Sequence, residues 1–392
     1  METAVIFGAG SVGRGFLGQL FSESGYELAF VDVDQPLVGA LARRGGYTLR
    51  LAGLARTEEL TIGPVRAIHG RRTARVAAEV AQASLMATAV GARALPNVAE
   101  SLAAGLTRRW ESGQTAPLNV IVCENLHDAP AVLHGYVREG LPKSLWPHLQ
   151  ARVGFVPAVI ARMSPVPTSE QRAVDPTLIV AEPYKVLPVD RDAFVGSIPD
   201  VVGMKPVSPF DAYVARKLYI HNAGHATLGY LGHWRGHIYG YEALDDPWVK
   251  QRLDRALEEA GHALVAEYGF EPVSFQEHVD YLLVRFANRA LSDPISRLCR
   301  EPLRKLAPND RLVGAARLAK HHDVQPTGLA WGIAAALAYD HPDDRDAVEL
   351  QARLAQEGLE RTLQSVCGIQ RNEPLAALIH ACYAQLKEEE TR

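Results

Sequence analysis

The chain has 392 residues, of which 47% are hydrophobic and 22% are charged, and its formal net charge is −4. This length favours two domains, and the composition lacks the long apolar run that a membrane-spanning helix requires. Because both signs of charge are mixed along the chain, we expect neither nucleic acid nor a membrane among its partners.

The chain opens with METAVIFGAG, which enters an apolar strand without the basic stretch and cleavable apolar segment of a secretory signal. We therefore expect a cytoplasmic protein. Its four cysteines, Cys123, Cys299, Cys367 and Cys382, lack the spacing of a zinc site or a disulfide framework. They are expected to act as small apolar side chains.

Apolar runs typical of strands alternate with helical patterns in the first half of the chain. The predicted strands are residues 4–7 (AVIF), 28–33 (LAFVDV), 85–90 (LMATAV) and 119–125 (NVIVCEN). Strands separated by helices indicate a parallel sheet covered on both faces, which is an α/β fold. Between residues 47 and 68 the runs become short and alternating, which predicts a small antiparallel insertion.

Helical periodicity dominates from about residue 209 to the end, for example in WVKQRLDRALEEAGHALVAEYGF. The chain is therefore predicted to join an α/β domain to a mainly α-helical domain. The joint is expected in the Pro-rich, strand-like segment around residues 183–208. We assign residues 1–195 to the first domain and residues 196–392 to the second.

The first predicted strand leads into FGAGSVGRG, which has GxGxxG spacing at the start of a helix. The first glycine permits a tight turn, the second lets the backbone approach a pyrophosphate, and the third lets helix and strand pack closely. The helix amides then face the diphosphate. This pattern predicts a Rossmann-type dinucleotide-binding domain, and a glycine turn without a ligand is the alternative. The predicted cofactor contacts are Gly8, Ala9, Gly10, Ser11, Val12 and Gly13.

Asp32 ends the second predicted strand, about 20 residues beyond the glycine loop, where a carboxylate can accept a hydrogen bond from the ribose 2′-hydroxyl. The same carboxylate would repel a 2′-phosphate, so NAD rather than NADP is the predicted cofactor. Asp34 is a competing candidate for this role. A second turn of small residues, Thr88, Ala89 and Val90, follows the next strand and is also expected to lie against the dinucleotide.

A lysine heads the helix-like stretch KLYIHNAGH, residues 217–225. On a regular α-helix, His225 lies roughly 80° and Asn222 roughly 140° around from Lys217, so the three share one broad face. A desolvated lysine can have its pKa lowered enough to take the proton of an alcohol, and amide donors can hold the developing alkoxide. Asn125, at the carboxyl end of its strand, is a second such donor. Alternatively, Lys217 reaches solvent and the other two are satisfied core polar groups.

Further histidines complicate the interpretation of this stretch. His221 lies at roughly 40° on the same helical wheel and could replace His225 in any role. His221, His225, His233 and His237 also raise the possibility of a metal site, since imidazoles four residues apart can chelate one ion. Because the chain has no HExxH motif and the nearby carboxylates lie outside this run, we expect no metal.

These residues resemble a known family. KLYIHNAGH is similar to the K-x4-N-x2-H pattern of the polyol-specific long-chain dehydrogenase/reductases (mannitol dehydrogenase family), as are the FGAGSVGRGF opening and the CEN turn. RFANRALSDPISRLCREPLRKLAPNDRL, residues 285–312, resembles the phosphate-specific branch, and the similarity covers nearly the whole chain. The resemblance implies NAD-dependent, metal-independent interconversion of D-mannitol 1-phosphate and D-fructose 6-phosphate. It implies Lys217 as general base, Asn125 and Asn222 as oxyanion contacts and His225 as a substrate contact.

Two positions depart from the family pattern, because Ala161 precedes Arg162 where aspartate is usual and His221 stands where leucine is common. A phosphate requires basic donors. If residues 297–305 are helical, arginines at i, i+3 and i+7 share a face. The candidates are Arg297, Arg300, Arg304, Lys305 and Arg311, of which at least one is predicted to bind the phosphate. A solvated basic stripe is the alternative.

Three other functions remain open for this sequence. An unphosphorylated polyol dehydrogenase or a hexuronate reductase would use the same catalytic residues. A dehydrogenase of the 3-hydroxyacid or 6-phosphogluconate type would also join the two kinds of domain, but its asparagine usually follows the lysine by four residues rather than five. A protein that senses NAD would bind the nucleotide without chemistry. In each case we expect a small-molecule ligand and a monomer or small homo-oligomer.

Overall fold

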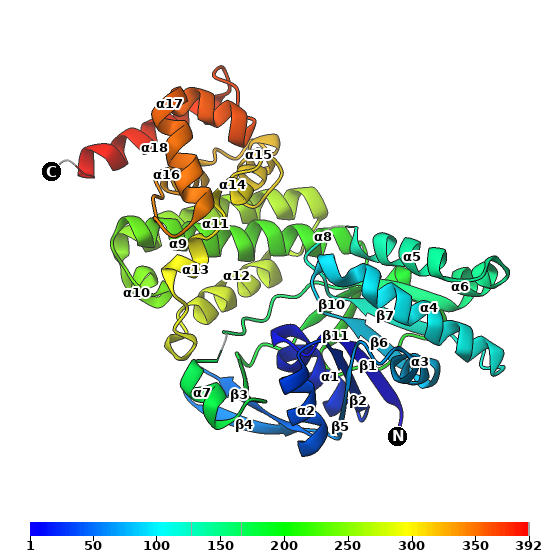
Figure 1. The fold of residues 1–392 in the computed structure, drawn as a ribbon. Coiled ribbons are helices and arrows are strands. Elements are labelled where there is room, and N and C mark those ends of the chain that lie inside the picture. The colour runs from blue at the N-terminus through cyan, green and yellow to red at the C-terminus, as the bar shows by residue number, and fades with distance from the viewer. Residues whose placement is uncertain (127, 166, 391–392) are drawn as a thin grey trace. The chain divides into compact units, whose positions relative to one another are not determined.

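The computed structural model describes residues 1–126, 128–165 and 167–390, and the chain forms two compact units (Figure 1). The first unit is Met1–Tyr213 and the second is Val214–Arg392. The sequence pattern predicts a division after residue 195. The contacts divide it later because β10 (Leu187–Asp190) pairs with β11 (Met204–Val207) and also bridges to Ala158 in the first unit.

The first unit is built on a six-stranded sheet in which every neighbouring pair is parallel, in the order β5-β2-β1-β6-β7-β8. Counted along the chain, this is the strand order 3-2-1-4-5-6 of a Rossmann fold. The predicted fold class is therefore confirmed. The strands are β1 (Thr3–Phe7), β2 (Glu27–Asp32), β5 (Val65–His69), β6 (Leu85–Thr88), β7 (Leu118–Val122) and β8 (Val153–Pro157).

Both faces of this sheet are buried, because successive side chains of a strand point to opposite faces. Ile6 of β1 belongs to a core cluster that includes Leu17 and Leu20, in and beside α1 (Gly18–Glu23). Its neighbour Val5 belongs to the cluster on the other face. There the sheet is covered by α3 (Thr73–Gln82), α4 (Leu95–Glu111) and α5 (Ala129–Gly140). The sheet is thus doubly wound.

The segment between residues 47 and 68 is only partly an antiparallel insertion. β3 (Tyr47–Ala52) and β4 (Thr57–Ile62) form an antiparallel pair as predicted, and β9 (Ile179–Ala181) joins β3 in parallel. The last run, residues 65–68, was wrongly included, because it belongs to β5 at the edge of the main sheet. Parallel pairing with β2 buries Val65 and Ile68.

The second unit is helical, as predicted. At its centre α9 (Ala223–Trp234), α11 (Pro247–Tyr268) and α16 (Thr327–Leu337) pack on one another. Every residue of α16 from Gly328 to Leu337 is buried, which follows from a sequence without any charged side chain, GLAWGIAAAL. Around them lie α10 (Gly240–Asp245), α12 (Pro272–Phe286), α13 (Ile295–Cys299), α14 (Pro302–Lys305), α15 (Val313–His321), α17 (Arg345–Cys367) and α18 (Pro374–Glu390).

A buried carboxylate joins two of these central helices. Glu259 of α11 is 1% exposed and accepts hydrogen bonds from the backbone N–H groups of Gly328 (2.9 Å) and Leu329 (3.1 Å). The first amides of a helix lack partners within the helix, and the helix dipole favours a negative charge beside them. Glu259 therefore anchors the start of α16 to α11. Within the described residues, none of the helices combines the length and apolarity needed to cross a membrane.

Candidate active site

The glycine loop follows β1 and approaches the turn that follows β6, its neighbour in the sheet. Gly8 has φ +97°, and a Cβ there would lie 2.3 Å from the carbonyl oxygen of Ala89. A Cβ on Gly13 would lie 1.9 Å from the carbonyl oxygen of Gly8. Both positions therefore require glycine for the protein's own packing. Gly10 differs, because it is exposed and a Cβ there would have no heavy atom within 4 Å.

This contrast leads to a prediction for two alanine variants. Gly13→Ala should destabilise the first unit, because the new methyl group overlaps backbone that cannot move freely. Gly10→Ala should fold normally and weaken NAD binding, because its methyl group occupies the space that a pyrophosphate needs. Thermal unfolding and NADH titration by fluorescence would measure both effects. Unchanged NADH affinity in Gly10→Ala would remove this loop from the nucleotide site.

Asp32, at the end of β2, holds the glycine loop in place. One carboxylate oxygen accepts from the backbone N–H of Ala9 (2.6 Å), and the other accepts from that of Asp34 (2.9 Å). A carboxylate has about four acceptor positions, so both oxygens can still accept from a ribose hydroxyl. The side chain of Asp34 instead caps α2 (Gln35–Arg44) by accepting a hydrogen bond from the backbone N–H of Leu37. The structure therefore separates the two candidates, with Asp32 beside the loop and Asp34 at the helix cap.

The second predicted turn, Thr88 to Gly91, is fixed by a residue that the sequence analysis did not single out. Glu124, just beyond β7, accepts from the N–H of Val90 (3.0 Å) and from the N–H of Gly91 (2.7 Å). Its neighbour Asn125 is exposed. Thr88 is fully buried at the end of β6, whereas Ala89 is half-buried. The carboxyl ends of β1, β6 and β7 thus form one edge, where ligands lie in such sheets.

In the second unit, the lysine stretch forms a π-helical turn, Lys217–Asn222, between α8 (Phe210–Arg216) and α9. The regular α-helical wheel used to place its side chains therefore does not apply, because a π-turn has hydrogen bonds from i to i+5. Such single turns occur frequently at functional sites. Lys217 and Asn222 are half-buried, and His221 is 7% exposed.

The two histidines of this stretch form an aromatic cluster with Phe286 of α12. The ring of His225 stacks on Phe286 at a centroid distance of 4.1 Å, and the ring of His221 meets His225 edge to face at 5.1 Å. Burial lowers the pKa of His225 to about 3; Asp293 acts against this shift, whereas Arg297 and Arg285 act with it. Burial also holds the pKa of His221 well below its usual value. Both imidazoles are therefore neutral at physiological pH, and His225 can donate or accept one hydrogen bond at each nitrogen.

The lowered pKa values of these histidines predict a loss of stability in mild acid. Burial also lowers the pKa of His278 on α12 to about 3. A histidine whose folded pKa lies below its unfolded value of about 6.5 stabilises the protein above pH 6.5. That contribution falls as the pH decreases below 6.5, by up to about 1.4 kcal/mol per pH unit for each of His221, His225 and His278.

Urea unfolding between pH 7.5 and 5.5 would measure this dependence while most carboxylates remain ionised. The free energy of unfolding should fall with decreasing pH, and His278→Asn should give a shallower slope than the wild type. A free energy that is constant over this range would contradict the proposal that these three histidines stay neutral in the folded state.

A small basic pocket lies beside the π-turn, entirely within the second unit. Its volume is about 180 Å³. Asn222 and His225 line it together with all five predicted phosphate-binding residues. The remaining lining residues are Ala226, Leu298 and Glu301. Lys217 is not part of its lining. The structure thus brings two of the catalytic candidates and the basic candidates into one cavity.

The basic residues do not lie on one helix, so the condition for a shared helical face is not met. Arg297 belongs to α13, whereas Arg304 and Lys305 belong to α14. The helix breaks at Arg300, and Glu301 has φ 60°. The turn between two short helices, rather than a helical periodicity, directs these side chains into the pocket.

Most of these cations already have carboxylate partners. Arg297 pairs with Asp293, Arg304 pairs with Glu301, and Arg311 pairs with Asp310. Lys305 is 5% exposed, donates to the carbonyl oxygen of Leu298, and has a pKa that burial lowers to about 7. Arg300 is exposed and makes no hydrogen bond or ion pair with any described residue. It is therefore the cation most available to an anionic ligand.

Other residues considered in the sequence analysis serve elsewhere. His233 contacts Asp340 and His237 contacts Asp246, so these two histidines are held by carboxylates from different segments. Arg162 is buried in the first unit, where it donates to the carbonyl oxygen of Glu182. The four cysteines are all free and buried, as predicted.

Comparison with known proteins places both units in one family. Residues 2–203 match the family model of the mannitol dehydrogenase Rossmann domain, and residues 209–389 match that of the mannitol dehydrogenase C-terminal domain. The chain is 40% identical to mannitol-1-phosphate 5-dehydrogenase of Brevibacillus brevis, over 98% of each chain. It is 39% identical to the Bacillus subtilis enzyme of the same name, over 96% of this chain and 98% of the relative.

Solved structures show the same fold at much lower identity. Mannitol 2-dehydrogenase of Pseudomonas fluorescens, solved in a ternary complex with NAD and D-mannitol, superposes with a TM-score of 0.76 at 19% identity, covering 99% of this chain and 92% of that one. A substrate-free D-sorbitol dehydrogenase gives a TM-score of 0.80 at 16% identity, covering 98% and 93%. The two family models together account for almost the entire sequence. The chain therefore belongs to the mannitol dehydrogenase family.

Proposed function

We propose that this protein is an NAD-dependent mannitol-1-phosphate 5-dehydrogenase, which interconverts D-mannitol 1-phosphate and D-fructose 6-phosphate. The relatives named above support this substrate. The observation that carries the proposal is the basic pocket of the second unit, because it joins Asn222, which can bind an alkoxide, and the substrate contact His225 to cations that suit a phosphate. A free polyol would not require those cations.

The first unit holds the nucleotide in this proposal. NAD supplies the hydride acceptor of the reaction. Gly10 gives its pyrophosphate close access to the backbone, and Asp32 accepts from the ribose hydroxyl. Glu124 acts through the turn that it fixes, because its two hydrogen bonds keep Val90 and Gly91 at the edge of the sheet.

Each catalytic candidate has one role in this proposal. Lys217, in its neutral form, takes the proton of the hydroxyl group on the carbon that loses the hydride. Asn125 and Asn222 donate hydrogen bonds to the oxygen as it gains charge, and no metal is involved. His225, held neutral and stacked on Phe286, orients a substrate hydroxyl. Arg297, Arg300, Arg304 and Lys305 bind the phosphate.

A substrate comparison tests this function. The purified protein should oxidise NADH when D-fructose 6-phosphate is added, and much more slowly with D-fructose or with hexuronates. Equal efficiency on phosphorylated and free sugars would favour a polyol dehydrogenase without phosphate specificity, and preference for a hexuronate would favour a reductase of that class. Nucleotide binding without any turnover would favour an NAD sensor.

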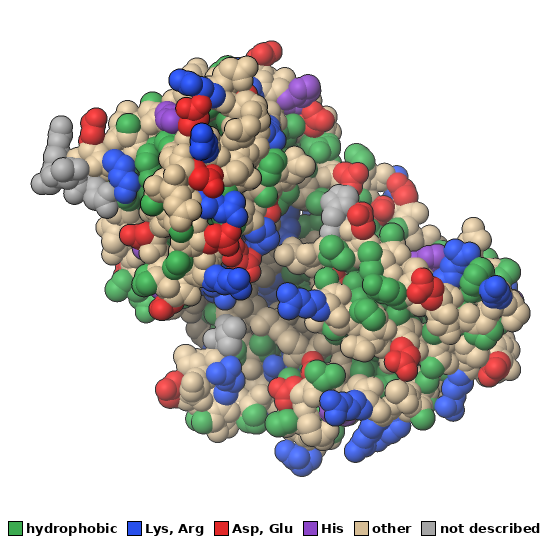
Figure 2. Space-filling view, turned by 45° about the horizontal axis from the view of Figure 1, so that its top comes forward, with side chains coloured by type: hydrophobic (Ala, Val, Ile, Leu, Met, Phe, Trp, Pro, Cys, Tyr) green, Lys and Arg blue, Asp and Glu red, His purple; other side chains and the backbone are tan. Residues whose placement is uncertain are grey.

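The surface supports a protein that acts on small molecules. Lys and Arg side chains are interspersed with Asp and Glu over the visible face rather than gathered by sign (Figure 2). This face therefore offers no extended electrostatic attraction to a nucleic acid or an anionic membrane. We propose that the enzyme works in the cytoplasm as a monomer or small homo-oligomer.

A further inference from the structure

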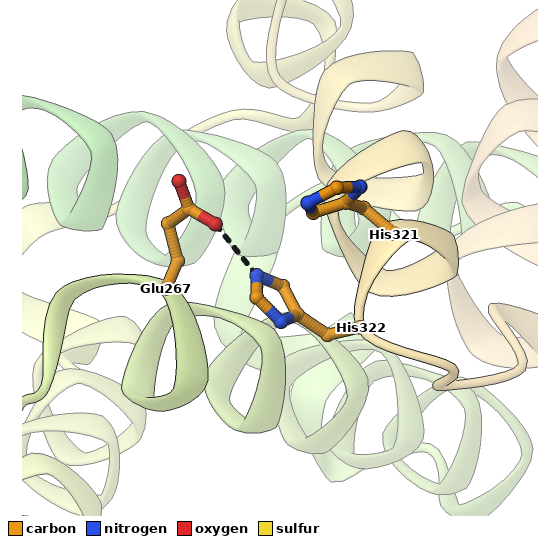
Figure 3. A group of neighbouring side chains, drawn as sticks. All are labelled: Glu267, His321 and His322. Carbon is orange, nitrogen blue, oxygen red and sulfur yellow. Dashed lines mark hydrogen bonds and ion pairs between the residues drawn. The ribbon is translucent and has the colours of Figure 1, made fainter.

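Three potential metal ligands meet in the second unit, outside the basic pocket. Glu267 lies in the last turn of α11, His321 is the last residue of α15, and His322 follows it. One ligand atom from each lies within 4.8 Å of the other two. Figure 3 shows the two imidazole rings and the carboxylate directed toward a common space between the helix ends. None of the three lines the basic pocket.

The local backbone explains how two consecutive histidines can point to one place. Within an α-helix, consecutive side chains are about 100° apart and do not face each other. Here α15 ends at His321, and His322 leaves helical geometry with φ −100° and ψ 27°. The ring centroids are 5.0 Å apart, with the planes at 82°.

The third ligand is already held beside them. Nε2 of His322 lies 2.6 Å from a carboxylate oxygen of Glu267, so the two side chains share a proton in the absence of an ion. His322 is half-buried, whereas Glu267 and His321 are exposed. Glu267 lies on α11, whereas the two histidines lie at the end of α15. The distance between the carboxylate and the imidazoles is therefore set by the packing of two helices rather than by the backbone of one loop.

We propose that Glu267, His321 and His322 form a binding site for one divalent transition-metal ion, such as Zn²⁺. Two imidazole nitrogens and a carboxylate oxygen are ligands that this class of ion prefers. With metal–ligand distances of about 2.0–2.2 Å, tetrahedral ligand atoms lie about 3.4 Å apart. The His322–Glu267 pair opens to this distance when the ion takes the place between them, and Nε2 then coordinates as part of a neutral imidazole that carries its proton on Nδ1. Water takes the fourth position, because the site is accessible.

The bound ion joins the C-terminal ends of α11 and α15. Because α11 packs on both α9 and α16, this link reinforces the helical core rather than the reaction site. Metal binding to the folded state alone raises thermal stability as the metal concentration exceeds its dissociation constant. The site therefore acts as a metal-dependent stabiliser and takes no part in the metal-independent chemistry proposed above.

Zn²⁺ titration of the tag-free, full-length protein tests this proposal, with competition against a chromogenic chelator to measure affinity. We expect one zinc ion per chain and a higher Tm with zinc than with chelator. His321→Gln and His322→Gln should each weaken binding at least tenfold. His380→Gln, an exposed histidine on α18, is the matched control and should bind zinc as the wild type does.

A Co²⁺ titration gives an independent measurement, because the visible spectrum reports imidazole coordination without any assay of turnover. His321→Gln keeps the hydrogen bond between His322 and Glu267, so it separates loss of a ligand from loss of the fold. Zinc affinity equal to that of the wild type in both histidine variants would overturn the proposal, as would the absence of a bound ion in the wild type. Chelator treatment should leave kcat with D-fructose 6-phosphate unchanged, and this outcome is independent of the binding result.

Discussion

Lys217→Ala should lower kcat by about 10²–10⁴-fold, the range that a general base contributes, while the affinity for NADH stays nearly unchanged. The lysine begins the π-turn that also carries Asn222, and it is half-buried in the second unit. Its proposed interaction with substrate forms only in the reaction step. The loss should therefore appear in kcat and in kcat/KM alike. Stopped-flow or steady-state NADH oxidation with D-fructose 6-phosphate would measure it.

Two controls distinguish loss of the base from loss of the fold. Lys217→Met keeps the length and apolar stem of the side chain and should be as inactive as Lys217→Ala, with an unchanged Tm. His221 is the first alternative base if Lys217 is not the base. His221→Asn should nevertheless retain most of its activity, because that imidazole is buried against His225 and Phe286. If Lys217→Met turned over normally and His221→Asn did not, the base would be His221.

Arg300→Ala should raise KM for D-mannitol 1-phosphate by about 10–100-fold, because a hydrogen bond to a charged group contributes about 1.5–3 kcal/mol. Arg300 is exposed in the basic pocket and has no partner among the described side chains that would compete for it. Activity on D-mannitol should not change, because that substrate has no phosphate. The ratio of the two kcat/KM values is therefore the quantity to measure.

The matched control for this variant is Arg353→Ala. Arg353 lies on α17, pairs with Glu349, and is not part of the pocket lining. Its removal should leave the ratio of the two substrates unchanged. Arg300→Lys should restore part of the preference, since a point charge remains although the planar pair of donors is lost. A ratio that is the same in Arg300→Ala and in the wild type would place the phosphate elsewhere.

The sequence predicted the features that depend on local pattern. Apolar strands alternating with helices indicate a parallel sheet. The glycine motif after β1 includes Gly8 and Gly13, where a larger side chain would overlap the backbone. These predictions succeed because the relevant contacts lie within a few residues or follow from one periodicity.

Other features of the candidate site could not be read from the sequence. The hairpin of β3 and β4 and the edge strand β5 have a similar alternation of apolar and polar residues. Only the pairing of β5 with β2 shows that β5 belongs to the main sheet. Glu124 is adjacent to Asn125 in the sequence, but the sequence does not reveal its role. That role depends on the amides of Val90 and Gly91, which lie in the connection after β6. The stack of His225 on Phe286 likewise joins two helices that are distant in sequence.

The amino-acid sequence by itself determined the fold class, the glycine loop and the types of residue available for catalysis, because strand and helix periodicity and turn stereochemistry are local properties. Only the tertiary structure decided which of those residues meet. The π-turn changes the helical phase after Lys217, and the break at Arg300 and Glu301 directs cations from two short helices into one pocket. In both places the backbone leaves regular α-helical geometry, which a helical wheel assumes throughout. The positions of these side chains therefore could not be derived from residue spacing.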